Sequence, residues 1–183
     1  MTAVALKLPV GPRRRIAALV GAAMLAAVVV AGCGGEATKD LETLDAPGFS
    51  VSMPGKPARS EQPVPTAGGT LKAVSYTSDS YGAAFTIAYS TLPEGSKGNL
   101  DGVLERAATN SGGTLRNEVA TTYQGYEARD ARITGAGENQ GTIFVRAIMT
   151  KDRLYMLQYL DTNPDVAKPP ATYGEILKSL KID

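Results

Sequence analysis

The amino-acid sequence predicts an α+β domain, an antiparallel β-sheet of about six to seven strands with two packed helices, behind a membrane-targeting leader. Three observations support this fold class. Apolar and polar residues alternate with the period of a β-strand over most of the chain after residue 48. Two later segments change to helical spacing, and an apolar run ending at a single cysteine precedes the whole domain. The order strands, helix, strands, helix is typical of an α+β architecture.

The first 32 residues have the pattern of a signal peptide. Lys7 and Arg13 to Arg15 form a positive start, and residues 16–30 are almost wholly apolar. This run is shorter than the roughly 20 residues of a spanning helix, and it ends in small residues, as cleaved signals do. The flanks of a twin-arginine signal are incomplete, so an ordinary positive region is the simpler interpretation.

The residues Val30-Ala31-Gly32-Cys33 resemble the lipobox of bacterial lipoproteins, in which the cysteine is joined to diacylglycerol and the chain is cut just before it. Cys33 is the only cysteine, and nothing around it can form a core. The resemblance implies a signal peptide over 1–32 and a lipid on Cys33. Two or more acyl chains anchor a protein stably, so we expect the extracytoplasmic face of the cell membrane.

The chain that remains after cleavage is mildly acidic. Removal of residues 1–32 takes away four cations and no acid, which leaves 15 Lys and Arg against 18 Asp and Glu. No basic field remains to attract nucleic acid, and no thiol remains for a disulfide or a catalytic thiolate. We expect a flexible lipidated tether over residues 33–47 and one domain over residues 48–183.

The first half of the domain reads as a meander of strands. Phe49, Val51 and Met53 alternate with serines, and a Pro-Gly pair ends that strand. Residues 59–64 predict an edge strand because the prolines around them cannot donate to a ladder. Residues 70–77 and 85–90 predict two further strands.

The first helix is predicted to begin at Asn99. Apolar residues recur from there at i, i+3, i+4, i+7 and i+8, which makes one continuous helical face centred on Leu104. Asn99 is a good N-cap residue, and Gly112-Gly113 supplies the end. We expect this helix to lie across one face of the sheet.

The second half predicts two hairpins and a final helix. Residues 114–123 and 126–134 flank the two-residue turn Gln124-Gly125. Residues 142–150 and 153–160 flank a second turn and are apolar on both faces, so we expect them to be the central strands. The last helix begins near a proline pair, and its buried stripe contains Tyr173, Ile176, Leu177 and Leu180.

Four short motifs resemble bacterial members of the Mog1/PsbP-like family. They are Phe49-Ser-Val-Ser-Met-Pro-Gly-Lys-Pro57, Gly125-Tyr-Glu-Ala-Arg-Asp130, Arg153-Leu-Tyr-Met-Leu157 and Lys178-Ser-Leu-Lys-Ile182. They are mainly turn and core positions, so they imply a fold rather than a reaction. Domains of this family are typically non-catalytic binding or assembly modules, which is what the resemblance implies here.

The composition gives no support for catalysis. The chain has no histidine, which excludes Ser-His-Asp and Cys-His catalysis and the usual zinc motifs. Glu127 and Asp130 could form an acid and base pair, but a solvated strand face explains them more simply. Oxygen ligands near residue 138 and residues 161–165 lack a calcium-loop pattern. We therefore predict no catalytic residue, no metal and no cofactor.

Eight tyrosines are the most suggestive remaining feature. A tyrosine ring with its hydroxyl suits a groove or a partner surface, although core packing is the simpler role for most of them. We expect Tyr126 and Tyr155 to line a candidate groove, with Arg129, Asp130 and Arg132 at its rim. The leading hypothesis is a membrane-anchored, non-enzymatic module that binds an envelope protein. The alternative is a carrier of a small ligand or lipid in a pocket between sheet and helix.

Overall fold

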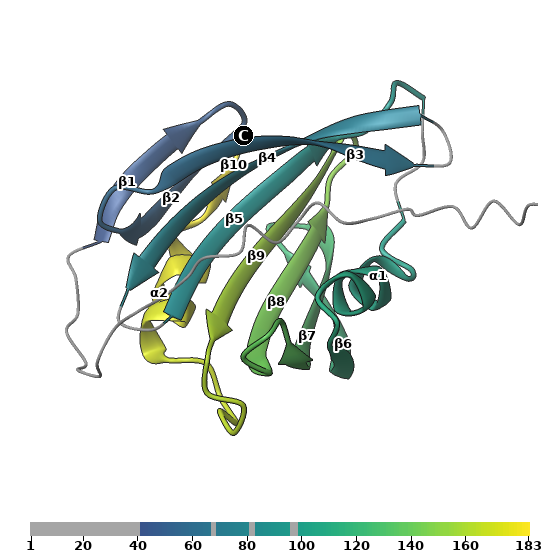
Figure 1. Ribbon diagram of the computed structural model, residues 1–183. Helices are drawn as coiled ribbons and strands as arrows, with labels where there is room; N and C mark the ends of the chain where they lie inside the picture. The colour runs from purple at the N-terminus through teal and green to yellow at the C-terminus, as the bar shows by residue number, and fades with distance from the viewer. Residues whose placement is uncertain (1–40, 67–68, 81–82, 96–98) are drawn as a thin grey trace, which may run out of the picture.

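A seven-stranded antiparallel sheet dominates the fold (Figure 1). The computed structural model describes residues 41–66, 69–80, 83–95 and 99–183, so the predicted signal peptide and Cys33 lie outside it. The strand order is β3-β4-β5-β9-β8-β7-β6. The strands are β3 Ala58–Thr66, β4 Gly69–Ser80, β5 Ala83–Thr91, β6 Thr114–Tyr123, β7 Tyr126–Ala136, β8 Gly141–Met149 and β9 Arg153–Asp161. The expected α+β class and strand number are confirmed.

A second, three-stranded sheet covers part of the first. It has the order β1-β2-β10, with β1 Leu41–Ala46, β2 Phe49–Pro54 and β10 Lys181–Ile182. The expected strand at Phe49 to Met53 is therefore present, but it belongs to this small sheet. Neither β1 nor β10 was expected from the sequence, because β10 has only two residues and β1 buries only part of its side chains.

The structure corrects the later part of the expected tether over residues 33–47, of which residues 33–40 lie outside the described part of the chain. Residues 41–46 pair antiparallel with β2, and Leu41 and Leu44 pack against the core. The half-buried side chains along β1 do not alternate, so the sequence shows no period-two signal there. The folded domain thus extends back to Leu41, seven residues before the expected boundary at 48.

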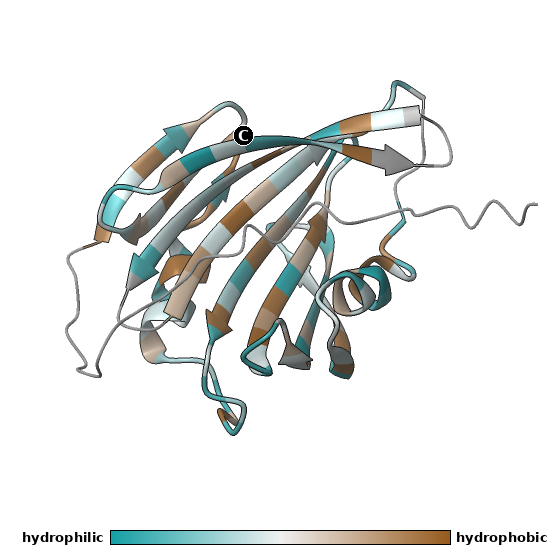
Figure 2. Cartoon of the chain, in the orientation of Figure 1, coloured by the Kyte–Doolittle hydropathy of each residue, from teal (hydrophilic) through white to brown (hydrophobic). Residues whose placement is uncertain are grey.

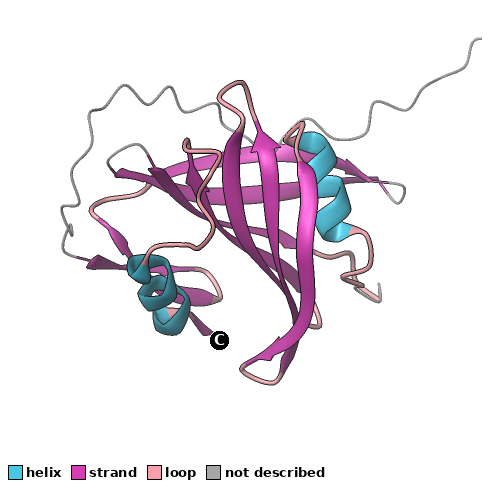
Figure 3. Cartoon of the chain, turned by 90° about the horizontal axis from the view of Figure 1, so that it is seen from below, coloured by secondary structure: helices cyan, strands magenta, loops and turns pink. Residues whose placement is uncertain are grey.

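Each face of the large sheet is covered by a different element (Figure 3). We call the side of Tyr155 and Leu157 the α2 face, where β2 and helix α2 (Ala171–Ser179) pack. We call the side of Ala147 and Met156 the α1 face, where helix α1 (Val103–Asn110) packs. Strands β8 and β9 are buried on both faces, as the sequence predicts.

Hydropathy bands follow this arrangement. Brown and teal residues alternate along the strands of the large sheet (Figure 2), because successive side chains of a strand point to opposite faces. In β7 this alternation places Ala128 in the cluster of the α2 face and Ile133 in that of the α1 face. Neighbouring residues of β7 therefore meet different surroundings.

Helix α1 starts later than the sequence predicts. Its N-cap is Gly102, which has φ 68° and no side-chain cap, and Asn99 lies outside the helix. The Asn99 side chain instead accepts a hydrogen bond from the backbone N–H of Asp101 at 2.5 Å. Leu104 is buried against the sheet as expected, and Gly112, at φ 69°, follows the end of the helix.

Candidate functional site

Strand β7 carries four of the five predicted groove residues, and it divides them between the two faces of the sheet. Asp130 and Arg132 share the α2 face with Tyr126, which packs against the core there. Arg129 is one residue out of phase, so it lies on the α1 face. The structure therefore brings Tyr126, Asp130 and Arg132 to one surface and places Arg129 on the other.

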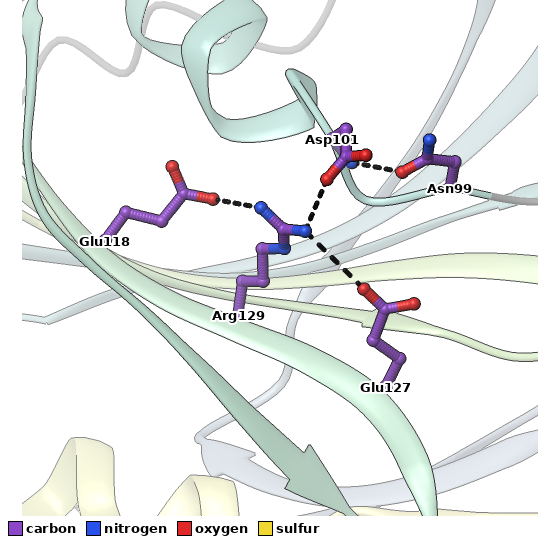
Figure 4. A network of polar contacts seen from close by, with 5 residues as sticks. All are labelled: Asn99, Asp101, Glu118, Glu127 and Arg129. Carbon is purple, nitrogen blue, oxygen red and sulfur yellow. Dashed lines mark hydrogen bonds and ion pairs between the residues drawn. The ribbon is translucent and has the colours of Figure 1, made fainter.

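Arg129 is the centre of an ion-pair network on the α1 face (Figure 4). Its guanidinium donates to Glu118 of β6 at 2.9 Å and to Asp101, just before α1, at 2.5 Å. Glu127 lies 3.7 Å from the same guanidinium, as an ion pair. These contacts join the start of α1 to the β6–β7 hairpin.

The network shifts the acidity of its members. The hydrogen bonds of Asn99 and Arg129 hold the pKa of the Asp101 carboxyl below its ordinary value. Hydrogen bonding to Glu118 is the main cause that raises the pKa of Arg129. Asp101 and Arg129 thus both stay charged at neutral pH. The role of the network that the geometry supports is structural: its ion pairs connect the segment before α1 to the β6–β7 hairpin.

Tyr155 belongs to the core rather than to a groove. It is 1% exposed, its ring packs edge-on against Phe49, and its hydroxyl donates to the carbonyl of Gly48 at 3.0 Å. Burial raises the pKa of this hydroxyl above its ordinary value. Tyr155 therefore has the core-packing role that was the simpler interpretation for most of the tyrosines.

An ion pair on the α2 face includes a residue that the sequence analysis missed. Arg146 of β8 donates from Nε and Nη2 to the two carboxylate oxygens of Asp130, each at 2.6 Å. Its guanidinium also lies 5.5 Å from the ring centre of Tyr123. Hydrogen bonding to Asp130 raises the pKa of Arg146. The sequence signal for Arg146 was its position as the one charged residue of the largely apolar strand β8.

The hairpin end is fastened to the C-terminal part of the chain. The Tyr123 hydroxyl lies 2.5 Å from the carbonyl oxygen of Leu177 and 2.7 Å from that of Leu180. The Gln124 side chain donates to Leu180 at 2.7 Å and accepts from the backbone N–H of Ile182 at 3.1 Å. These bonds close one end of the α2 face, and they join segments far apart in the sequence.

The α2 face stays partly open at its β6–β7 end. Val119 of β6 is 59% exposed and is opposite Asp130 in the ladder. Arg116 is exposed and lies opposite Arg132, while Tyr126 is half-buried at the other end of β7. We call Arg116, Val119, Tyr126, Asp130, Arg132 and Arg146 the open surface. It combines cations, an aromatic ring and an exposed apolar side chain.

The cavity between the large sheet and α2 that the described residues form is small. A cavity lined by Met53, Ile87, Leu157, Ile176 and their neighbours has a volume of only about 10 Å³, about enough for one water. Small-molecule sites usually need about 300–1,000 Å³. This cavity therefore has no room for the small ligand that a carrier would hold between sheet and helix.

Neither alternative site of the sequence analysis is assembled. Glu127 and Asp130 project from opposite faces of β7, so they cannot act together as an acid and base pair. Within the described residues, no group of three or more His, Cys, Asp or Glu side chains is placed to hold a metal ion. In that same part of the chain, no helix is long and apolar enough to cross a membrane.

The comparisons with known proteins identify the fold class. No protein-family model matches the chain, and no curated protein matches it. Its structure is similar to the solution structure of cyanobacterial PsbP (CyanoP) from Synechocystis sp. PCC 6803. The TM-score is 0.55 at 12% sequence identity, and the match covers 84% of this chain and 99% of that chain. The protein therefore has a PsbP-like α+β fold, which confirms the fold that the four motifs predicted.

Proposed function

We propose that this protein is a membrane-anchored lipoprotein whose domain is a non-enzymatic module that binds an envelope component at the open surface. A PsbP-like fold suggests a binding module rather than an enzyme. The observation that carries the proposal is that arginines, a tyrosine and the exposed Val119 lie together on a partly open sheet face, while the described cavity under α2 has room for only about one water. Tyr and Arg are enriched in protein interfaces and in their energetic centres. A surface of this kind can bind a partner without a pocket.

Membrane attachment rests on the lipobox resemblance. Replacement of Cys33 with Ala removes the thiol that the lipid requires, so a Cys33→Ala chain should accumulate as an unlipidated precursor that keeps residues 1–32. Intact-mass analysis of the membrane fraction measures both properties. A Cys33→Ala protein that is fully processed and lipidated would end the argument for anchorage, and it would leave the binding surface untouched.

Binding at the open surface is tested with a photoreactive residue in the full chain. Val119 and Ala120 are adjacent on β6 and point to opposite faces, so they form a matched pair of positions. We expect cross-linked adducts in cells when the probe replaces Val119 and few when it replaces Ala120. Equal labelling at both positions, or none at either, would contradict a binding role for this face.

A further inference from the structure

Arg116 and Arg132 face one another on the open surface. They are directly opposite in the β6–β7 ladder, and opposite residues of an antiparallel pair point to the same side with Cβ atoms about 4.5–5.5 Å apart. Like charges in this position destabilise a sheet. A bound anion would therefore stabilise a pair of guanidiniums at such a place.

Neither guanidinium has a compensating anion within the described part of the chain. Among the residues that the structure describes, no hydrogen bond or ion pair reaches the side chain of Arg116 or Arg132. The Nε of Arg132 is also buried without a partner. Buried polar groups in folded proteins are nearly always hydrogen-bonded, so an unpaired donor of this kind calls for an explanation.

The nearby carboxylates are all committed elsewhere. Asp130 gives both oxygens to Arg146. Glu118 and Glu127 project from the α1 face, where they pair with Arg129. Strand alternation therefore separates the charges of the hairpin, and the open surface keeps two cations that no described carboxylate pairs with.

The backbone beside Arg116 is irregular. The ladder shifts register between Arg116 and Val119, and Asn117 in this bulge has φ 51°. Bulges often re-aim side chains next to functional sites. A non-glycine residue at positive φ costs free energy that the surrounding structure must supply. The bulge and the positive φ of Asn117 thus lie directly beside Arg116.

We propose that Arg116 and Arg132 bind the dianionic phosphate of a phosphomonoester, which deepens the proposed function by naming the chemistry of the bound component. In the Asp130–Arg146 pair, a single guanidinium already uses both oxygens of a carboxylate. A phosphomonoester carries about −1.5 to −2 charges and three acceptor oxygens at neutral pH. It can accept from two guanidinium forks at once, which a carboxylate with two oxygens does less well.

Two sources can supply this group, a soluble phosphomonoester and the headgroup of a phosphatidic-acid-type lipid. The probe for the first is inorganic phosphate, added to the full chain in maltoside micelles and followed by NMR at the backbone amides of Val119 and Tyr126. We expect saturable shifts at both amides. Arg116→Gln and Arg132→Gln should each weaken phosphate binding by about tenfold or more, since each removes charge-assisted hydrogen bonds.

The matched control is Arg106→Gln, which removes an exposed arginine of α1 and should leave the affinity unchanged. Acetate at equal ionic strength is the control ligand, and we expect it to cause no saturable shift. Three results would overturn the phosphate site: no saturable shift with phosphate, an equal response to acetate, or equal weakening by Arg106→Gln.

Nanodiscs distinguish the two sources. The full chain in phosphatidylcholine nanodiscs is compared with the chain in nanodiscs that also contain phosphatidic acid. Arg132-dependent shifts in the second alone assign the site to a lipid headgroup, and shifts only with free phosphate assign it to a soluble phosphomonoester. Failure here is separable from failure of the proposed function: adducts at position 119 that persist in Arg132→Gln would keep the binding module and remove the phosphate site.

Discussion

Gly48 leaves space for the Arg153 side chain to lie directly against the β1–β2 turn. It lies in the two-residue turn between β1 and β2 with φ 88°, and its carbonyl accepts from the Tyr155 hydroxyl at 3.0 Å. The Arg153 side chain passes directly over it, donates to the carbonyl of Pro47 and lies above the Tyr89 ring, 5.3 Å from its centre. The absence of a Cβ at position 48 makes this close approach possible.

Gly48→Ala is therefore expected to destabilise the domain more than an ordinary glycine substitution. A Cβ at this position would lie 1.8 Å from Nη1 of Arg153, so the arginine must leave its place. The left-handed backbone adds about 1–2 kcal/mol. Gly55→Ala is the control, since Gly55 also has positive φ but nothing within 4 Å of the new carbon. Urea denaturation measures both, and equal losses would mean that the Arg153 contact contributes nothing.

The residue scale is also where prediction from sequence was least complete. The groove residues of β7 were expected to act together, yet a strand sends Arg129 and Asp130 to opposite sides. The same alternation left Arg116 and Arg132 together on one side. The partner of Asp130 was missed, because Arg146 meets it only through the register of a strand that a hairpin brings alongside. The sequence identifies the charged and aromatic residues, whereas which of them contact one another depends on the register between strands.

At the scale of elements, the β6–β7 hairpin is the most informative. Its turn at Gln124-Gly125 was predicted from a two-residue spacing, and the structure has φ values of 50° and 83° there, as the favoured hairpin turns require. The sequence did not indicate that the same turn fastens α2 and β10. That role depends on contacts between residues more than 50 positions apart, which no local pattern records.

Tyr123→Phe tests this fastening. The change removes only the hydroxyl that contacts the carbonyl oxygens of Leu177 and Leu180, and such a loss typically costs about 0.5–1.5 kcal/mol. We also expect faster hydrogen exchange at the backbone N–H of Ile182, which bonds to the adjoining Gln124. Both quantities are measurable on one sample.

Tyr126→Phe is the matched control for that experiment. Tyr126 is opposite Tyr123 in the hairpin, and its hydroxyl has no hydrogen bond to any described residue. Its removal should change the free energy of unfolding by less than about 0.5 kcal/mol. If both variants lost equal stability, the phenol rings rather than the Tyr123 hydroxyl would be responsible.

For the whole molecule, the sequence predicts the large sheet and both helices because each repeats a local period over many residues. The seven strands and the central position of β8 and β9 follow from alternation and from strands that are apolar on both faces. The small sheet was not predictable in the same way. β10 contributes two residues, and β1 depends on its ladder with β2 more than on its own pattern. Elements that are stabilised mainly by tertiary contacts leave a weak signal in sequence.

The domain boundary is the point at which this difference can be measured. A chain of residues 41–183 keeps β1, while a chain of residues 48–183 loses six paired positions against β2 and the packing of Leu41 and Leu44. The lost burial of two partly covered leucines predicts a decrease of about 2–4 kcal/mol in the free energy of unfolding. Within 41–183, Leu44→Ala should cause part of that loss, while Thr43→Ala, an exposed position, should change little. Equal urea midpoints for the two chains would show that β1 adds no stability to the domain, and the boundary of the stable domain would then be residue 48.

A lower midpoint for 48–183 would leave only residues 34–40 between Cys33 and the first strand, a span of at most about 25 Å. That length would keep the domain, and with it the open surface, close to any bilayer that holds the lipid of Cys33.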